Sequence, residues 1–497
     1  MANLSSDASE SISETFALQY DIAARANMHE VDAALSSIPA NQRLRSSGAL
    51  ALRSVKALLQ GNPDAGVALL QRAIDHDTSA SRFYLVEILT PVLISRGEWE
   101  QAAELLDSTV GAPPQITPAL DALRAVISAR QGRDDESREI SACAFEAASA
   151  IEDPLLLARV TQRMSIAAFY RQEFGEAHER GMEAARAHES LQSYRSAALA
   201  YSVIYNIAFT YNGDLTMARY YAERISLNAK RGGDQAMHTY GLVSQFHIAA
   251  ESGERRRIGS IRSRLLAVQR HEQLQERSAF VLSEILMAGW AGTFDIARKS
   301  LLVLRDESSH LRNMRALCDG LLAVVAAAEW QLDDARTLAR RTISASTQRS
   351  GHEAQFETRA RVIARYLASA ACFITGDNFR GTRALSRSFD PDGRLTASLS
   401  VNGVAEDMLP TVMRGYGLFI NAAFESARRR RPAFGLTPAE LEILKRLPSG
   451  DTFASIANAR GTSRRTVERQ VDTLYAKLGA RNRTDAINKA RDLRLLL

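Results

Sequence analysis

Short connectors between helix-like segments recur along most of the chain, and their spacing constrains the fold more than any other feature. Each well-formed connector has a bulky apolar residue two positions after its first residue and an alanine five positions after it. These connectors are GEWEQA at Gly97, QEFGEA at Gln172, GDLTMA at Gly213, GTFDIA at Gly292 and WQLDDA at Trp330, with vaguer counterparts at Gly61, Gly132, Gly253 and Gly376. Neighbouring connectors mostly lie 35 to 41 residues apart, the length of one helical hairpin with its turn.

The segments between the connectors have a helical composition. From Ser13 to Ala427 the sequence is rich in Ala, Leu, Arg and Glu and has few prolines, which favours helix. Glycine lets the chain turn, the apolar residue docks the turn, and alanine permits close approach of the paired helix. The pattern resembles degenerate tetratricopeptide repeats. We therefore predict an all-α fold with a tetratricopeptide-like solenoid over residues 13–427; a non-repetitive helical bundle is the alternative.

Stacked hairpins leave a concave surface suited to a partner. We therefore expect the repeats to bind a protein, a peptide or a small ligand, and RNA polymerase is one candidate partner. A group of tyrosines could line this groove or could serve in ordinary packing between helices. These are Tyr201, Tyr205, Tyr211, Tyr220 and Tyr221.

Several other features bear on the location of the protein. The longest uncharged apolar run, Gly320–Ala328, is far below the roughly 20 residues that cross a bilayer. Residues 1–12 are polar and acidic, and we expect a disordered leader rather than a signal peptide. The cysteines Cys143, Cys318 and Cys372 are too scattered for a disulfide framework or a zinc site. We predict a cytoplasmic protein with no membrane segment and no bound metal.

Charge is distributed unevenly along the chain. Residues 428–497 contain 16 Lys and Arg against 7 Asp and Glu, a net charge of +9, whereas the first 427 residues carry −4. A basic module on a mildly acidic body suggests that the tail meets a polyanion, and a solvated tail is the alternative. Residues 389–403 contain turn signals and are predicted to form a loop. A final helix over 406–430 should stop at Pro432, within a basic linker at 428–435.

The remaining residues, 436–497, predict a compact set of helices. Thr437 is a natural N-cap, Pro438 suits the first helical position, and Glu440 occupies the capping-box position. A second helix is expected over 453–459. Gly461 supplies a turn into a third helix, capped by Ser463 and running from Arg464 to Leu478. Its apolar stripe consists of Val467, Val471, Leu474, Tyr475 and Leu478.

A short helix, a glycine turn and an amphipathic helix with a basic start indicate a helix-turn-helix. The segments LTPAELEIL (436–444), SIA (455–457), S-x-x-TV (463–467) and LYAKLGARNRTDA (474–486) resemble the LuxR-type DNA-binding domain. The resemblance implies a four-helix module whose third helix reads operator DNA and whose fourth helix mediates dimerisation on DNA. Candidates for the dimer contact are Ala486, Ile487, Ala490 and Leu493, which could instead pack on the first three helices.

The sequence departs from that family at several positions. Ala439 replaces a customary basic residue, Glu468 a lysine, Gln470 a histidine, Arg460 a leucine and Thr462 an apolar residue. These changes weaken nonspecific attraction to phosphate and make the turn less apolar, while they leave the helical frame intact.

The exposed face of the third helix carries the candidate DNA contacts. We assign base reading to Arg465, Glu468, Arg469 and Asp472, because a carboxylate can accept from the cytosine amino group and an arginine can grip guanine. Phosphate contacts are assigned to Arg464, Thr466, Arg481 and Arg483. In the alternative interpretation, Glu468 and Asp472 form ion pairs within the helix and only lower affinity.

Large ATP-dependent LuxR-type regulators also carry an ATP-binding module, but no G-x-x-x-x-G-K-[ST] loop occurs in this chain. Catalytic motifs such as H-E-x-x-H and G-x-S-x-G are also missing from the sequence. We therefore expect no enzyme and no cofactor. The sequence predicts a sequence-specific transcription regulator whose repeats sense a partner or ligand and control a DNA-binding module. The alternative is an interaction scaffold whose helix-turn-helix docks on protein.

Overall fold

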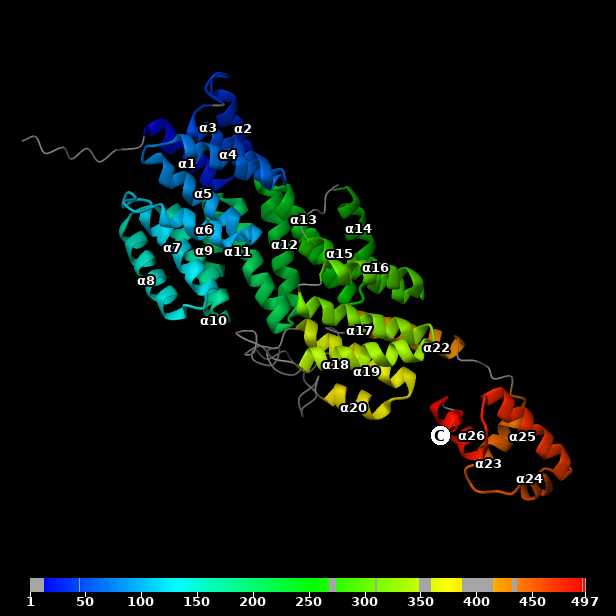
Figure 1. Cartoon of the computed structure of the whole chain (residues 1–497). Helices are drawn as coiled ribbons and strands as arrows, with labels where there is room; N and C mark the ends of the chain where they lie inside the picture. Colours follow the sequence, from blue (N-terminus) through cyan, green and yellow to red (C-terminus); the bar gives the residue numbers. More distant parts are fainter. Residues whose placement is uncertain are drawn as a thin grey trace, which may run out of the picture. The chain divides into compact units, whose positions relative to one another are not determined.

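The computed structural model describes residues 13–43, 45–267, 274–308, 311–347, 359–386, 414–430, 436–493 and 495–496. Every regular element in these ranges is a helix, which confirms the predicted all-α fold class (Figure 1). The chain divides into two compact units, Met1–Ser283 and Glu284–Leu497. The predicted leader at 1–12, the loop at 389–403 and the linker residues 431–435 lie outside the described residues.

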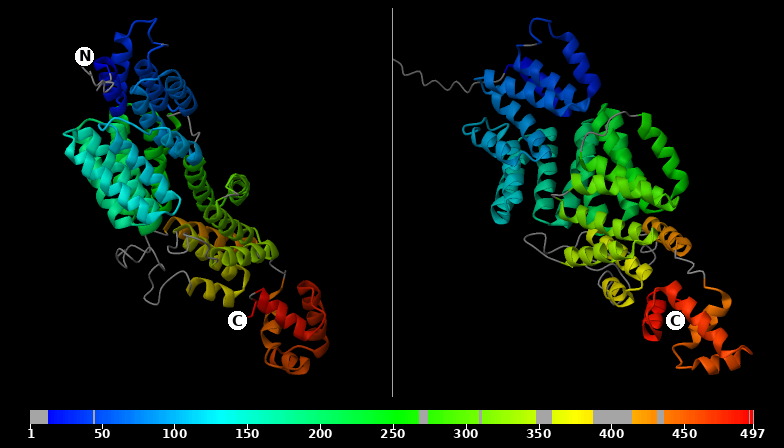
Figure 2. Two further views of the ribbon diagram at one scale, coloured as in Figure 1. Left: turned by 60° about the vertical axis from the view of Figure 1, so that its left-hand side comes forward. Right: turned by 45° about the vertical axis from the view of Figure 1, so that its right-hand side comes forward.

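In the first unit, consecutive helices pair as hairpins. The helices are α1 (Glu14–Arg25), α2 (Met28–Ser37), α3 (Ser47–Leu59), α4 (Pro63–His76), α5 (Ser81–Arg96), α6 (Trp99–Asp107), α7 (Thr117–Arg130), α8 (Asp134–Ala150), α9 (Pro154–Tyr170), α10 (Phe174–Ser190), α11 (Tyr194–Asn206), α12 (Leu215–Gly232), α13 (Gln235–Glu251) and α14 (Arg255–Ala267). A π-helix, η1 (Ile207–Asn212), extends α11. Two further views show the same succession of paired helices (Figure 2).

The connectors identified in the sequence are turns inside the helical hairpins of both units, and each contains one residue in the left-handed conformation. Most are glycine, as at Gly97 with φ of 79° and Gly292 with φ of 77°, where glycine avoids the clash of a Cβ atom. The exceptions among the hairpin turns are Ala26, Gln172 and Trp330. The alanine five positions on is fully buried in each well-formed connector: Ala102, Ala177, Ala218, Ala297 and Ala335. The small side chain therefore allows the helix pairing that the pattern predicted.

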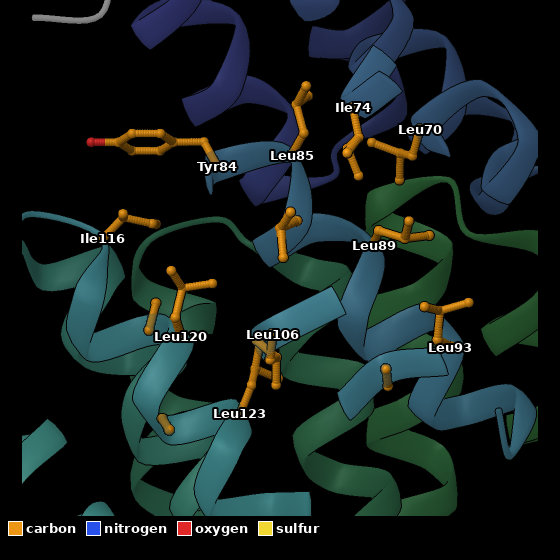
Figure 3. Packing of buried hydrophobic residues seen from close by; sticks show 14 of the residues in the cluster. Leu70, Ile74, Tyr84, Leu85, Leu89, Leu93, Leu106, Ile116, Leu120 and Leu123 are labelled. Atoms are coloured by element: carbon orange, nitrogen blue, oxygen red, sulfur yellow. The ribbon is translucent and has the colours of Figure 1, made fainter. Parts of the chain in front are cut away.

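Buried leucines and isoleucines join the first five hairpins of the first unit in one large cluster. Leu85, Leu89 and Leu93 repeat along α5 and are fully buried. They share a cluster with residues from α4, α6 and α7 (Figure 3). Because adjacent hairpins cover each other's apolar faces, this cluster extends from α1 to α9, beside two smaller clusters of buried residues.

The first two hairpins also contact helices far along the sequence. The hydroxyl of Ser193 donates to the Arg25 carbonyl at 3.3 Å, and Arg159 Nη1 donates to the Tyr20 hydroxyl at 2.6 Å. Helix α1 accordingly contacts α11, and α3 contacts α13. The inner helices of this unit therefore surround a common interior.

The tyrosines near residues 201–221 serve mainly in packing. Tyr201, Tyr205 and Tyr221 are at most 5% exposed. Tyr211 packs against Phe174 with ring centroids 4.3 Å apart, and Tyr220 is 45% exposed. The packing alternative therefore holds for the three buried rings.

The second unit contains further helical hairpins and one additional helix that packs against them. Its repeat helices are the end of α15 (Leu274–Trp290), then α16 (Phe294–Glu307), α17 (Arg312–Ala328), α18 (Leu332–Thr347), α19 (Arg359–Thr375), α20 (Asn378–Ser386) and α22 (Arg414–Arg430). Helix α22 packs on α17 and α19. Trp290 Nε1 donates to the Gly415 carbonyl at 2.8 Å. Of the helix expected over 406–430, the structure describes the part from Arg414 onward.

Candidate nucleic-acid interface

The last helices of the chain form a small module with its own core. They are α23 (Pro438–Arg446), α24 (Phe453–Ala459), α25 (Arg464–Leu478) and α26 (Arg483–Asp492). The predicted caps are present: Thr437 Oγ1 accepts from the Glu440 amide at 3.2 Å, and Glu440 Oε2 accepts from the Thr437 amide at 2.6 Å. Ser463 Oγ accepts from the Thr466 amide at 3.1 Å. Local hydrogen bonds therefore fix the starts of α23 and α25 where the sequence placed them.

One face of α25 is buried against the other helices of the module. Val467, Val471, Leu474 and Leu478 are at most 6% exposed and Tyr475 is partly buried, in a cluster with Ile443, Leu444, Leu447 and Ile456. This confirms the predicted apolar stripe. Burial of that stripe turns the opposite, charged face of α25 outward.

The outward face of α25 carries two kinds of charged residue. Arg464 Nε pairs with Glu468 Oε1 at 2.8 Å, and the two side chains are 70% and 42% exposed. Arg465, Arg469 and Asp472 are exposed, and among the described residues none of the three has an ion pair. The intrahelical pairing considered for the two acidic residues is therefore present for Glu468 and not for Asp472. Thr466 is also exposed beside Arg465.

Two departures from the LuxR pattern contact each other. Arg460 Nη1 donates to Gln470 Oε1 at 2.9 Å, and Arg460 Nε pairs with Glu442 at 3.2 Å. The Arg460 side chain is 11% exposed, so its charge is satisfied by a polar contact between α23, the turn and α25. The sequence showed both departures singly but gave no sign that they are partners.

The phosphate candidates after α25 differ in their surroundings. Arg481 is exposed. Arg483 is partly buried, and its guanidinium donates to the Leu447 carbonyl at 2.6 and 3.1 Å and to the Asp451 carbonyl at 2.9 Å. These bonds tie α26 to the loop after α23, and they occupy donors that a phosphate contact would need. The assignment of both arginines to phosphate stays a prediction.

The dimerisation candidates on α26 also divide into two groups. Ala486 and Ala490 are fully buried in the core of the module, while Ile487 and Leu493 are partly buried at its edge. Packing on the first three helices therefore accounts for the two alanines. Among the four candidates, Ile487 and Leu493 have surface that a second copy could cover.

A buried ion pair joins the first and third helices of the module. Lys477 Nζ donates to both carboxylate oxygens of Glu440, at 2.9 and 2.7 Å, and Glu440 is 4% exposed. Burial alone would raise the pKa of Glu440, but hydrogen bonds from Lys477 and Thr437 outweigh it and hold the pKa below its ordinary value. The capping residue predicted from local sequence thus also makes a tertiary contact that the sequence did not reveal.

The fold and this surface define a helical-repeat protein with a C-terminal helix-turn-helix module. Residues 435–490 match the family model described as bacterial regulatory proteins, luxR family, so the module is a LuxR-type domain. Among curated proteins, the chain is 37% identical over 67 residues to the transcriptional regulatory protein YdfI of Bacillus subtilis (strain 168). The match covers 14% of this chain and about a third, 32%, of that relative.

A solved structure is similar to the chain over most of its length. It is titled the crystal structure of the APC/C hetero-tetramer Cut9-Hcn1, and the likeness covers 92% of this chain and 88% of the other. The TM-score is 0.35 at 12% identity. None of the helices in the described ranges contains an apolar stretch that could span a bilayer. In the same ranges, no group of three or more His, Cys, Asp and Glu side chains is placed to hold a metal ion.

Proposed function

We propose that the chain is a sequence-specific DNA-binding transcription regulator. The observation that carries the proposal is the outward face of α25, where Arg465, Arg469 and Asp472 project from a helix whose other side is buried in the core of a LuxR-type module. In a helix-turn-helix this face lies in the major groove. Arginine grips the O6 and N7 atoms of guanine, and a carboxylate accepts from the cytosine amino group.

The contacts of α25 support different roles for its two acidic residues. Glu468 is paired with Arg464 and lowers the net attraction of that turn to phosphate, whereas Asp472 is available to a base. We propose that Arg465, Arg469 and Asp472 read bases, with Glu468 at the edge of the reading surface. Arg464, Thr466 and Arg481 hold the backbone, and Ile487 and Leu493 contact a second copy on DNA.

The repeats take the sensing role in this proposal. Binding of a protein, peptide or small ligand to the solenoid would change access to the DNA-binding module or its pairing with a second copy. RNA polymerase is one protein that we propose as a partner of the repeats.

The test begins with selection of genomic fragments that the purified full chain binds, followed by titrations on the selected site at several salt concentrations. Arg469→Ala should cost about 1–3 kcal/mol and relax the preference at one base position, because a bidentate base contact is lost. Arg481→Ala is the matched control. It should weaken all sequences about equally and reduce the salt slope by about one.

An unchanged sequence preference in Arg469→Ala would contradict the base-reading role. Failure of the chain to shift any fragment, together with strong capture of a protein by the module, would favour the scaffold alternative over the regulator.

A further inference from the structure

A cavity lies inside the first unit and is lined by the first helix of each of six successive hairpins. Its volume is ≈ 430 Å³, within the range of pockets that hold small organic molecules. The lining residues come from α1, α3, α5, α7, α9 and α11. The contact of α1 with α11 brings the two ends of this series together around the cavity.

One end of the cavity contains a buried cluster of charges. Glu87 is 2% exposed, and its Oε1 is shared by ion pairs to Arg159 and Arg163, whose side chains are each 8% exposed. The Tyr20 hydroxyl donates to Glu87 Oε2 at 3.1 Å and accepts from Arg159 Nη1 at 2.6 Å. Arg163 Nη1 donates to the Ala119 carbonyl at 2.8 Å. Two guanidinium groups therefore share one carboxylate.

The neighbouring ionisable groups do not cancel the surplus positive charge. Burial and the nearby Arg159 lower the pKa of His188 to about 3, so its imidazole is neutral. Burial raises the pKa of Tyr20, so its phenol is neutral as well. Arg195, the other charged residue that lines the cavity, is paired with Asp234 at 2.5 Å. The carboxylate of Asp153 also acts on Tyr20, but it lies at the exposed start of α9 and accepts from the Leu155 and Leu156 amides. One buried positive charge is therefore left without a buried counter-charge, which is costly in a protein interior.

The cavity changes from charged to apolar along its helices. On α9 the lining residues Arg159, Arg163, Ile166 and Tyr170 are spaced i, i+4, i+7 and i+11, so they share one face and span about 16 Å. Leucine, isoleucine and valine side chains of α3, α5, α7 and α11 line much of the remaining wall, interspersed with the polar residues Ser95, Gln162, Ser196 and Ser202. At the far end, α11 passes into the π-helix η1 immediately after Asn206, which also lines the cavity.

We infer that this cavity binds a small organic acid, whose single carboxylate completes the Glu87–Arg159–Arg163 cluster and whose apolar body lies along α9 and α11. The bound carboxylate supplies the missing negative charge, and a guanidinium is the side chain best suited to hold it. The inference deepens the sensing role proposed above and rests on that proposal only for its link to transcription.

The test uses isothermal titration calorimetry on the full chain without DNA, with 4-phenylbutanoate as the probe and 4-phenylbutanamide as its neutral control. The acid should bind at least tenfold more tightly than the amide. Glu87→Gln keeps the shape of the resident group and removes its charge, so it should tighten binding of the acid severalfold and leave the amide unchanged.

A pair of tryptophan substitutions tests the position of the site. Ser202 lines the cavity wall on α11, and Ser202→Trp should abolish binding of the acid. Ser149→Trp, on the exposed surface of α8, should leave it unchanged. Circular dichroism checks that both variants fold, and the Glu87→Gln result stands whether or not Ser202→Trp does.

The inference is overturned if the acid does not bind, if acid and amide bind equally, or if Glu87→Gln weakens binding of the acid. Because no DNA is present, these outcomes are independent of the DNA-binding test. A chain that binds DNA and not the acid would refute the ligand site alone, and the reverse result would refute the regulator alone.

Discussion

Replacement of Glu440 by glutamine should lower the stability of the C-terminal module at neutral pH. The glutamine oxygen can still accept from the Thr437 amide, so the cap itself survives. The charged hydrogen bonds to Lys477, at 2.9 and 2.7 Å, lose their carboxylate in a site that is 4% exposed. Hydrogen bonds to charged groups contribute about 1.5–3 kcal/mol each, and the retained neutral contact offsets part of that. We expect a net loss of about 1–2 kcal/mol.

Hydrogen exchange of the α23 and α25 amides, measured by mass spectrometry on the full chain, reports this loss. Protection should fall by roughly 5- to 30-fold in Glu440→Gln. Glu442→Gln is the matched control: its partner is Arg460, its own side chain is 50% exposed, and exposed pairs contribute about 1 kcal/mol or less. Equal loss of protection in the two variants would refute the reasoning.

The same pair predicts the direction of the pH dependence. Because the folded state lowers the pKa of Glu440, its contribution is complete above the ordinary carboxyl pKa and is lost as the pH falls through the folded pKa. The difference between the natural protein and Glu440→Gln should therefore shrink as the pH falls below 4.5, the ordinary value. A difference that grows in acid would contradict the assignment.

Two further predictions concern packing and the altered turn. Gly241→Ala should destabilise the contact between α12 and α13 by about 1–3 kcal/mol, because the new Cβ would lie 2.7 Å from the Ser226 backbone nitrogen. Gly259→Ala is the control: its Cβ would meet no atom within 4 Å, so it should not destabilise α14. Local hydrogen exchange of these helices distinguishes the two variants. Arg460→Ala and Gln470→Ala should show a coupling energy of about 0.5–1.5 kcal/mol in a double-mutant cycle on module stability, and strictly additive effects would show that their 2.9 Å contact contributes nothing.

Local chemistry accounts for what could be predicted about the fold. A connector such as GTFDIA at Gly292 specifies its turn through one left-handed residue and specifies close helix pairing through Ala297, which is fully buried. Thr437 and Ser463 are equally local signals, because each hydroxyl accepts from the backbone amide three residues later in the chain. Such signals act within one or two helical turns, so a single sequence contains all the information that they need.

The sequence contains indications of the buried charges, but each of them has a second interpretation. Glu87 is the only acidic residue in α5, and Arg159 and Arg163 lie four residues apart as the only charged residues in α9. Each pattern taken alone is also compatible with a solvated face. Arg460 and Gln470 were likewise visible as separate departures, and Arg483 was assigned to phosphate because nothing local showed its three bonds to backbone carbonyls.

The sequence by itself determined the helices, their turns, the hairpin period and the charged face of α25, because each depends on residues within a few positions of one another. Only the tertiary structure decided which of those charges have partners. Arg159 meets Tyr20 across 139 residues, and Lys477 meets Glu440 across 37. Contacts at such separations form when whole hairpins pack, and periodicity along a chain contains no record of which distant residues that packing brings together.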